Sequence, residues 1–178
     1  MLDDHSRLYI WNVLNKATIK DIRCIRRACL PAIMEVHIAK DGVNYIVSTK
    51  VNFRILCNGE SVLVFDDMVL DKKGNELSYR RYCAQKDLEK TLICEELIKV
   101  NALFRNKKIY SCVVSSYGDV ELNVRRIGKI QFLNTTHYND YDVLTVLRYP
   151  KEGGSKPEEL LNVVTVDGKD IVVQWSND

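Results

Sequence analysis

Side chains able to do acid–base or metal chemistry are few and scattered along this chain. Its 178 residues include three histidines. His37 follows Glu35 by two positions in an alternating run, which places both side chains on one face of a strand, a spacing that a metal ion can use. No third ligand lies nearby in register. We therefore interpret the two as a hydrogen-bonded or exposed pair and expect neither a metal ion nor another cofactor.

The segment 134–142, NTTHYNDYD, carries the densest set of polar groups in the chain. His137 and Asp140 are residue types that serve as a general base or as cation ligands, and connecting segments often carry such groups. Asn, Asp and Thr also hydrogen-bond their own backbone and form turns. A turn is the favoured interpretation, and His137 and Asp140 are retained as candidate catalytic residues.

The longest stretch with helical periodicity predicts a central helix over residues 86–104. Glu96 falls within the apolar side of this helix. A carboxylate in such a place extends to solvent, pairs with a cation such as Arg80 or Arg125, or titrates with a raised pKa in a pocket. We favour the paired, structural role. Glu96 is the third candidate catalytic residue, and finding it buried without a cation would favour an enzyme.

A shorter helix is predicted over residues 19–30, because Thr18 with an acid three positions later resembles a helix start and a proline follows. On that helix Lys20, Arg23 and Arg27 recur at i, i+3 and i+7 and so share an exposed side. Three cations on one side predict a contact with phosphates or with an acidic partner. The favoured interpretation is a solvated helix face with cations near its carboxyl end, and the three cations are retained as candidate binding residues.

Most of the remaining chain reads as strands. Residues 7–14 are interpreted as a strand, although this apolar run is short. Two alternating runs around Asp41 and Gly42 predict a hairpin, and its second run continues over residues 43–56. Lys50 and Arg54 lie on the wet face of that run, and we add them to the candidate binding residues.

These patterns together predict an α+β fold. We expect about eight to ten strands in antiparallel meanders, forming an open or barrel-like sheet, together with the two helices. Residues 1–178 are expected to be one domain, with a short loop at 150–158 before a C-terminal hairpin at 160–175. A chain of this length can bury a core without covalent staples.

The six cysteines show neither CxxC pairs nor zinc-site spacing. The first residues lack a basic region followed by an apolar one, and the apolar runs fall short of the roughly 20 residues that span a bilayer. These features predict reduced thiols and a cytosolic or nuclear protein that is neither secreted nor membrane-spanning.

The formal net charge of +2 gives no argument for a nucleic acid partner by itself, so local clusters must decide. Adjacent cations recur along the chain, interleaved with tyrosines: Arg26–Arg27, Arg80–Arg81, Lys107–Lys108 and Arg125–Arg126. Neighbours on a strand point to opposite faces, which would leave one charge per pair for any patch.

This dilution favours a protein partner over nucleic acid. We expect a non-enzymatic binding module that contacts a macromolecule, with self-association through a strand edge as a further option. Two alternatives stay open. One is a small hydrolase or nuclease-like enzyme with dispersed carboxylates and a histidine, and the other is a single-stranded nucleic-acid-binding protein.

Overall fold

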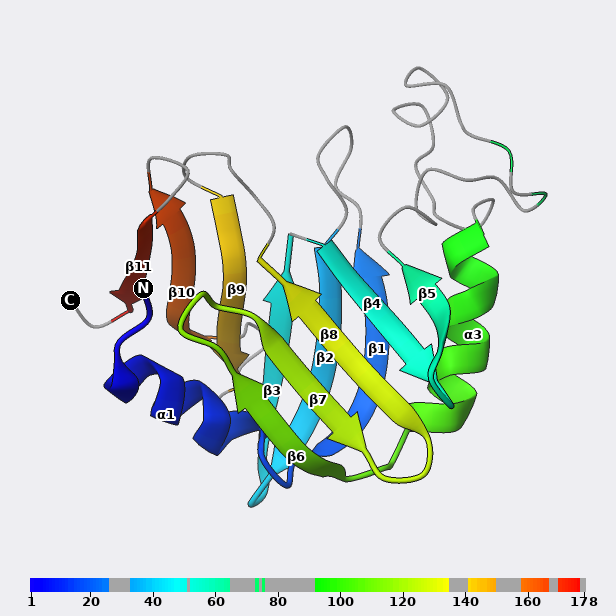
Figure 1. The fold of residues 1–178 in the computed structure, drawn as a ribbon. Coiled ribbons are helices and arrows are strands. Elements are labelled where there is room, and N and C mark those ends of the chain that lie inside the picture. The colour runs from blue at the N-terminus through cyan, green and yellow to red at the C-terminus, as the bar shows by residue number, and fades with distance from the viewer. Residues whose placement is uncertain are drawn as a thin grey trace.

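Two antiparallel sheets make up most of the structure, which is a computed structural model (Figure 1). It describes residues 1–25, 33–50, 52–64, 73, 75, 92–134, 141–149, 158–166 and 170–176. The six-stranded sheet has the order β1 (Thr18–Ile25), β2 (Ile33–Lys40), β3 (Val43–Thr49), β9 (Tyr141–Arg148), β10 (Glu158–Val166) and β11 (Asp170–Trp175). The five-stranded sheet has the order β5 (Glu60–Val64), β4 (Asn52–Cys57), β8 (Gly128–Leu133), β7 (Val120–Val124) and β6 (Ile109–Val114).

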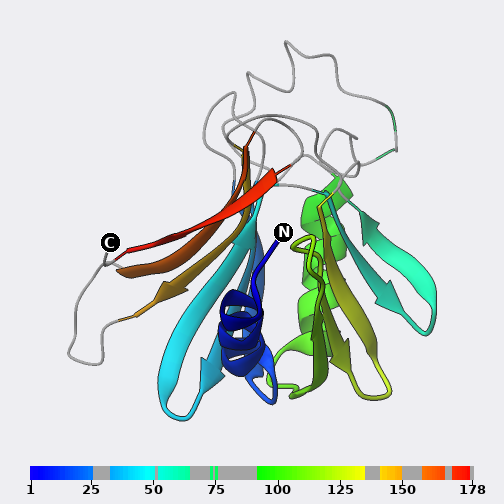
Figure 2. The same ribbon diagram turned by 60° about the vertical axis from the view of Figure 1, so that its left-hand side comes forward.

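The two sheets face each other across one core (Figure 2). Val36 and Val146 of the six-stranded sheet, and Ile55 and Phe132 of the five-stranded sheet, belong to the same cluster of buried side chains. Alternate residues of most strands supply this core, as expected for strands with one wet face. The antiparallel α+β class predicted from the sequence is confirmed, and the sheets are open rather than closed into a barrel.

The hairpin predicted around Asp41 and Gly42 is present, and both residues have the positive φ, 50° and 79°, that a type I′ turn requires. The continuous strand predicted over residues 43–56 is wrong. The chain leaves the six-stranded sheet after Thr49 and enters the five-stranded sheet at Asn52. The odd-numbered residues Val47 of β3 and Phe53 and Ile55 of β4 all belong to the core, so the apolar alternation continues through this crossing and does not reveal it.

The helix predicted over residues 19–30 is also wrong where the structure describes it, because residues 18–25 form β1. This strand pairs with β2 along its length, and a β-bulge lies between Ile19 and Asp21. The bulge brings Ile19 and Ile22, three positions apart, onto the buried side together. A spacing of three imitates helical periodicity, which explains the error.

Helix α1 (Asp4–Leu14) replaces the strand predicted over residues 7–14. It begins with Asp3, whose carboxylate accepts a hydrogen bond of 2.7 Å from the Ser6 backbone N–H. Ile10 and Leu14, four positions apart, are fully buried. Asp3 lies upstream of the apolar run at residues 7–14. A helix is predicted only when the capping residue and the apolar run are considered together.

Helix α3 (Leu92–Phe104) ends where the sequence predicted, while the first residues of the predicted helix, 86–91, lie outside the described residues. Its buried side consists of Ile93, Val100 and Phe104. It packs against β1 and β5, which are the edge strands of the two sheets on that side (Figure 1).

Helix α1 bridges the two sheets on the opposite side. It contacts the edge strand β6, and Arg7 Nε donates a hydrogen bond of 3.4 Å to the Val114 carbonyl. His5 and Tyr9 contact Trp175 of the other edge strand, β11, with ring centroids 5.5 and 5.0 Å apart. Each of the four edge strands therefore contacts a helix, a common way of protecting sheet edges.

The Asn101 side chain of α3 makes two hydrogen bonds to the backbone of the edge strand β1, as a neighbouring strand would. Its side-chain oxygen accepts the Ile22 N–H at 2.9 Å, and its amide nitrogen donates to the Ile22 carbonyl at 2.7 Å. We predict that Asn101→Ala lowers the free energy of unfolding by about 2 kcal/mol, because both backbone groups lose their partner. Urea unfolding tests this against Asn12→Ala, an exposed substitution on α1 with the same change in helix propensity. Equal effects in the two variants would refute the role of Asn101.

Candidate functional site

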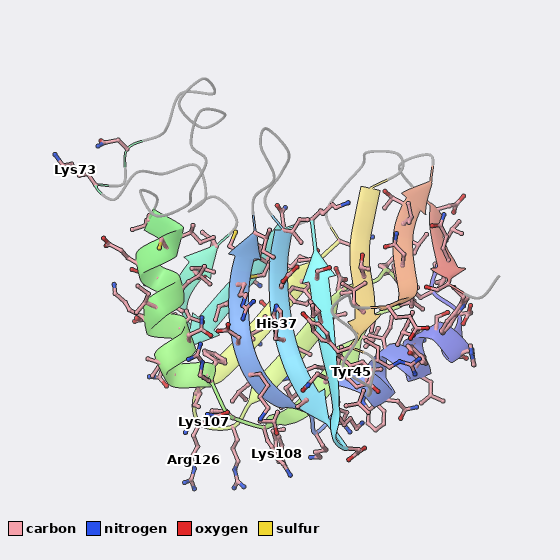
Figure 3. All side chains as sticks on the ribbon, turned by 180° about the vertical axis from the view of Figure 1, so that it is seen from behind. His37, Tyr45, Lys73, Lys107, Lys108 and Arg126 are labelled. Carbon is pink, nitrogen blue, oxygen red and sulfur yellow. The ribbon has the colours of Figure 1, made fainter. Side chains whose placement is uncertain are left out.

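Four cations gather where two connections of the five-stranded sheet meet. Lys107 and Lys108 lie between α3 and β6, and Arg125 and Arg126 lie in the turn between β7 and β8. All four side chains are exposed. Because Ile109 pairs with the residue before Arg125, the two cation pairs extend side by side beyond the strands. Figure 3 shows Lys107, Lys108 and Arg126 projecting from the same end of the molecule. We call these four residues the basic end.

The backbone that carries Lys107 and Lys108 is anchored to the start of β1. Ile19 donates its N–H to the Lys107 carbonyl at 2.9 Å and accepts the Asn106 N–H at 2.7 Å. The Ile109 N–H donates to the Ala17 carbonyl at 2.8 Å. These bonds hold the connection at both ends, so that its two lysines project from a fixed backbone.

A fifth cation joins the basic end through Tyr110, whose side chain is 55% exposed. Lys16 Nζ lies 4.6 Å from the centre of the Tyr110 ring and donates a hydrogen bond of 2.7 Å to the Tyr110 carbonyl. The guanidinium carbon of Arg125 lies 5.8 Å from the same ring. The attraction between each cation and the electrons of the Tyr110 ring orders the side chains of Lys16 and Arg125.

A groove of about 340 Å³ lies beside the basic end, between the β7–β8 turn and the β4–β5 turn. Leu56 and Lys129 are partners on neighbouring strands and lie in the groove, on the face of the sheet away from the core. Arg125, Ile127 and Tyr110 also line it. The groove therefore combines cations with apolar and aromatic surface.

Below the groove, Glu121 holds together a polar network on the same face. Its carboxylate accepts hydrogen bonds from Lys129, Asn123 and Gln131, and Gln131 in turn accepts one from Arg54. Partial burial tends to raise the pKa of Glu121, but the three hydrogen bonds and the charge of Lys129 outweigh it, and the pKa is lowered. The network fixes Lys129 in the lining of the groove.

This lowered pKa makes a prediction about acid stability. The ionised carboxylate stabilises the fold fully above the ordinary glutamate pKa of about 4.3, and the contribution is lost as the pH falls through the lower pKa of the folded state. Glu121 is partly exposed, so we expect about 1 kcal/mol or less at pH 7. In urea unfolding, Glu121→Gln should be less stable than the wild type at pH 7, and the two should converge as the pH falls through the lowered pKa of the folded state. The exposed Glu60→Gln is the control, and a difference independent of pH would contradict the prediction.

The binding residues predicted from the sequence do not form one stripe. Lys20 is exposed at the β1 bulge, and Arg23 pairs with Asp21 at 2.7 Å. Lys50 lies in the connection between β3 and β4, and Arg54 lies on the other sheet. The remaining candidate, Arg27, lies outside the described residues. Lys20 of this set follows Ile19, whose N–H donates a hydrogen bond to the Lys107 carbonyl in the basic end.

The catalytic candidates gain no support. Glu96 accepts a hydrogen bond of 2.6 Å from Lys99, so it has a cation partner, as predicted, although the partner is its neighbour on the helix. His137 and Asp140 lie outside the described residues. His37 Nε2 lies 2.9 Å from the Glu35 carboxylate, the hydrogen-bonded pair expected from the sequence. Among the described residues, no group of three or more His, Cys, Asp or Glu is arranged to hold a metal ion.

Among the described cysteines, Cys57, Cys94 and Cys112 have free thiols. Burial raises the pKa of the Cys112 thiol to about 12 and also raises that of Cys57. Both thiols are therefore protonated at neutral pH and are poor nucleophiles. Cys29 and Cys83 lie outside the described residues.

Two further findings bear on function. Within the described ranges, no helix is both long enough and apolar enough to cross a membrane. Comparison of the chain with protein-family models, with curated proteins and with solved structures gives no match.

Proposed function

We propose that this protein binds nucleic acid through the phosphate backbone, using the basic end as the contact surface. One observation carries the proposal: Lys107, Lys108, Arg125 and Arg126 are brought together, and none of them forms an ion pair with another described residue. Four unneutralised cations in one place favour a ligand with closely spaced negative charges.

Most other cations with a defined contact behave differently. Arg23 and Arg105 both bond Asp21, and Lys99 and Arg148 each bond a glutamate. Such pairs leave little charge for a partner. The near-zero net charge of the chain therefore hides a local excess of positive charge at the basic end.

The sequence favoured a protein partner because adjacent cations on a strand face opposite ways. That reasoning does not apply here, since Arg125 and Arg126 lie in a turn and Lys107 precedes β6. Protein interfaces are also depleted of lysine at their centres, whereas phosphate backbones are contacted mainly by lysine and arginine. Nucleic acid is therefore the better match.

Fluorescence anisotropy with a labelled single-stranded oligonucleotide at low salt tests the proposal. We expect a dissociation constant in or below the range of about 10⁻⁴ to 10⁻⁶ M typical of phosphate-driven binding. Polyglutamate with the same number of charges serves as a competitor that imitates an acidic protein. Displacement of the oligonucleotide by an equal concentration of polyglutamate would favour a protein partner instead, and absence of binding would refute the proposal.

A further inference from the structure

We infer that the groove beside the basic end holds an unpaired base, so that the nucleic acid bound is single-stranded. This inference rests on the proposed function and adds a substrate class to it. It concerns surface that phosphate binding does not use, namely the apolar and amide-bearing part of the groove.

The floor of the groove is a row of neighbouring residues on the outward face of the five-stranded sheet. Leu56 of β4 pairs with Lys129 of β8, which pairs with Asn123 of β7. A row across three strands gives a broad, shallow floor. The walls are two turns, one containing Asn58 and the other containing Ile127, and they are joined by a hydrogen bond of 3.2 Å from the Asn58 N–H to the Ile127 carbonyl.

The chemistry of this lining matches a base better than a phosphate. Leu56 and Ile127 are partly exposed apolar side chains, and Tyr110 adds an exposed ring at one side. Bases of unpaired strands lie against apolar and aromatic side chains and against arginine guanidinium planes, which Arg125 offers here. A phosphate gains nothing from the apolar side chains of Leu56 and Ile127.

The groove also offers hydrogen-bonding groups for the edge of a base. Asn123 Nδ2 donates to Glu121 at 3.1 Å, which leaves the Asn123 side-chain carbonyl as an acceptor with no partner among the described residues. Lys129 is held by Glu121 at 3.1 Å and supplies a donor at the floor. An acceptor and a donor next to apolar surface suit the polar edge and apolar face of a nucleobase.

The size and position of the groove argue against a duplex. At about 340 Å³ it is at the small end of ligand pockets and suits one nucleotide rather than several. In a duplex the bases are stacked and paired, so that none enters a side pocket unless it is flipped out. A single strand can place a base in the groove while its neighbouring phosphates contact the basic end, since Arg125 and Arg126 belong to both surfaces.

The test compares three labelled probes of equal length: a single-stranded oligonucleotide, a strand of abasic sugar-phosphates, and a duplex. We expect the single strand to bind about tenfold more tightly than either of the others. In Leu56→Ala the advantage over the abasic strand should shrink to about twofold or less, while abasic binding stays within twofold of the wild type. Tyr117→Ala, at an exposed tyrosine in the β6–β7 turn, is the control and should leave the advantage intact.

The outcomes separate the two proposals. Equal binding of the abasic and the complete strand would overturn the base site and leave the proposed phosphate contact standing. Tighter binding of the duplex would overturn the single-strand assignment in the same way. Absence of binding to all three probes at low salt would refute the proposed function, and the base site with it.

Discussion

Replacing Lys107, Lys108, Arg125 and Arg126 together with glutamine is expected to weaken binding of a single-stranded oligonucleotide by at least about 100-fold at low salt. Each contact between unit charges at about 4 Å is worth on the order of 1 kcal/mol in water, and four such contacts are lost. Glutamine preserves side-chain length and polarity, and the exposed positions contribute little to the fold. Fluorescence anisotropy gives the affinity, and thermal unfolding shows that the variant is folded.

A second variant with the same loss of charge separates local from overall electrostatics. Arg23, Lys73, Lys99 and Arg148 are exposed, and Figure 3 shows Lys73 far from the basic end. Substituting these four with glutamine also removes four positive charges. We expect its affinity to stay within about threefold of the wild type, since Arg23, Lys99 and Arg148 are already paired with carboxylates and the charge of the distant Lys73 is screened by salt. An equal loss of affinity in the two variants would mean that net charge alone drives binding.

Gly128→Ala is expected to lower the free energy of unfolding by at least about 3 kcal/mol. Gly128 begins β8 and lies between Cys57 of β4 and Val124 of β7. A Cβ atom at this position would lie 1.8 Å from the Leu56 carbonyl oxygen. Because that atom belongs to the backbone, β4 and β8 must separate to admit the methyl group, which breaks sheet hydrogen bonds.

Gly42→Ala is the matched control for this prediction. Gly42 also follows a turn residue, but a Cβ atom there meets nothing within 4 Å, and only its φ of 79° disfavours alanine. We expect a cost of about 1 kcal/mol at Gly42, from the left-handed conformation alone. Urea unfolding of both variants gives the comparison. Similar costs would show that the close approach of β4 and β8 does not limit the size of residue 128.

The fold class could be predicted because most strands bury alternate residues. The errors have local causes. The β1 bulge places Ile19 and Ile22 on one side, and three-residue spacing resembles a helix. The apolar alternation is the same before and after the crossing at Thr49. It therefore predicts one strand, although β3 belongs to the six-stranded sheet and β4 to the five-stranded sheet. A bulge or a crossing between sheets leaves no mark in the residue types. Both are determined by how the strand pairs with other strands.

The candidate site was harder to predict because it depends on register. Lys107–Lys108 and Arg125–Arg126 were recognised as basic pairs, but they are more than 15 residues apart and meet only because Ile109 pairs with Val124. The turn itself left a signal: Gly128 follows Arg126 closely, and glycines punctuate turns. Arg126 has a φ of 62°, which is uncommon for a residue with a side chain. If Arg125 and Arg126 are read as turn residues, both are predicted to project from the same end of the sheet.

The salt dependence of binding tests the central claim most directly. If the four cations of the basic end contact phosphates of a single strand, the logarithm of the affinity should fall against the logarithm of salt concentration with a slope of about −3 or steeper. The variant with glutamine at Lys107, Lys108, Arg125 and Arg126 should have a slope shallower by about 3. The control variant, with glutamine at Arg23, Lys73, Lys99 and Arg148, should keep the wild-type slope. A slope that is the same in all three proteins would contradict the assignment of phosphate binding to the basic end.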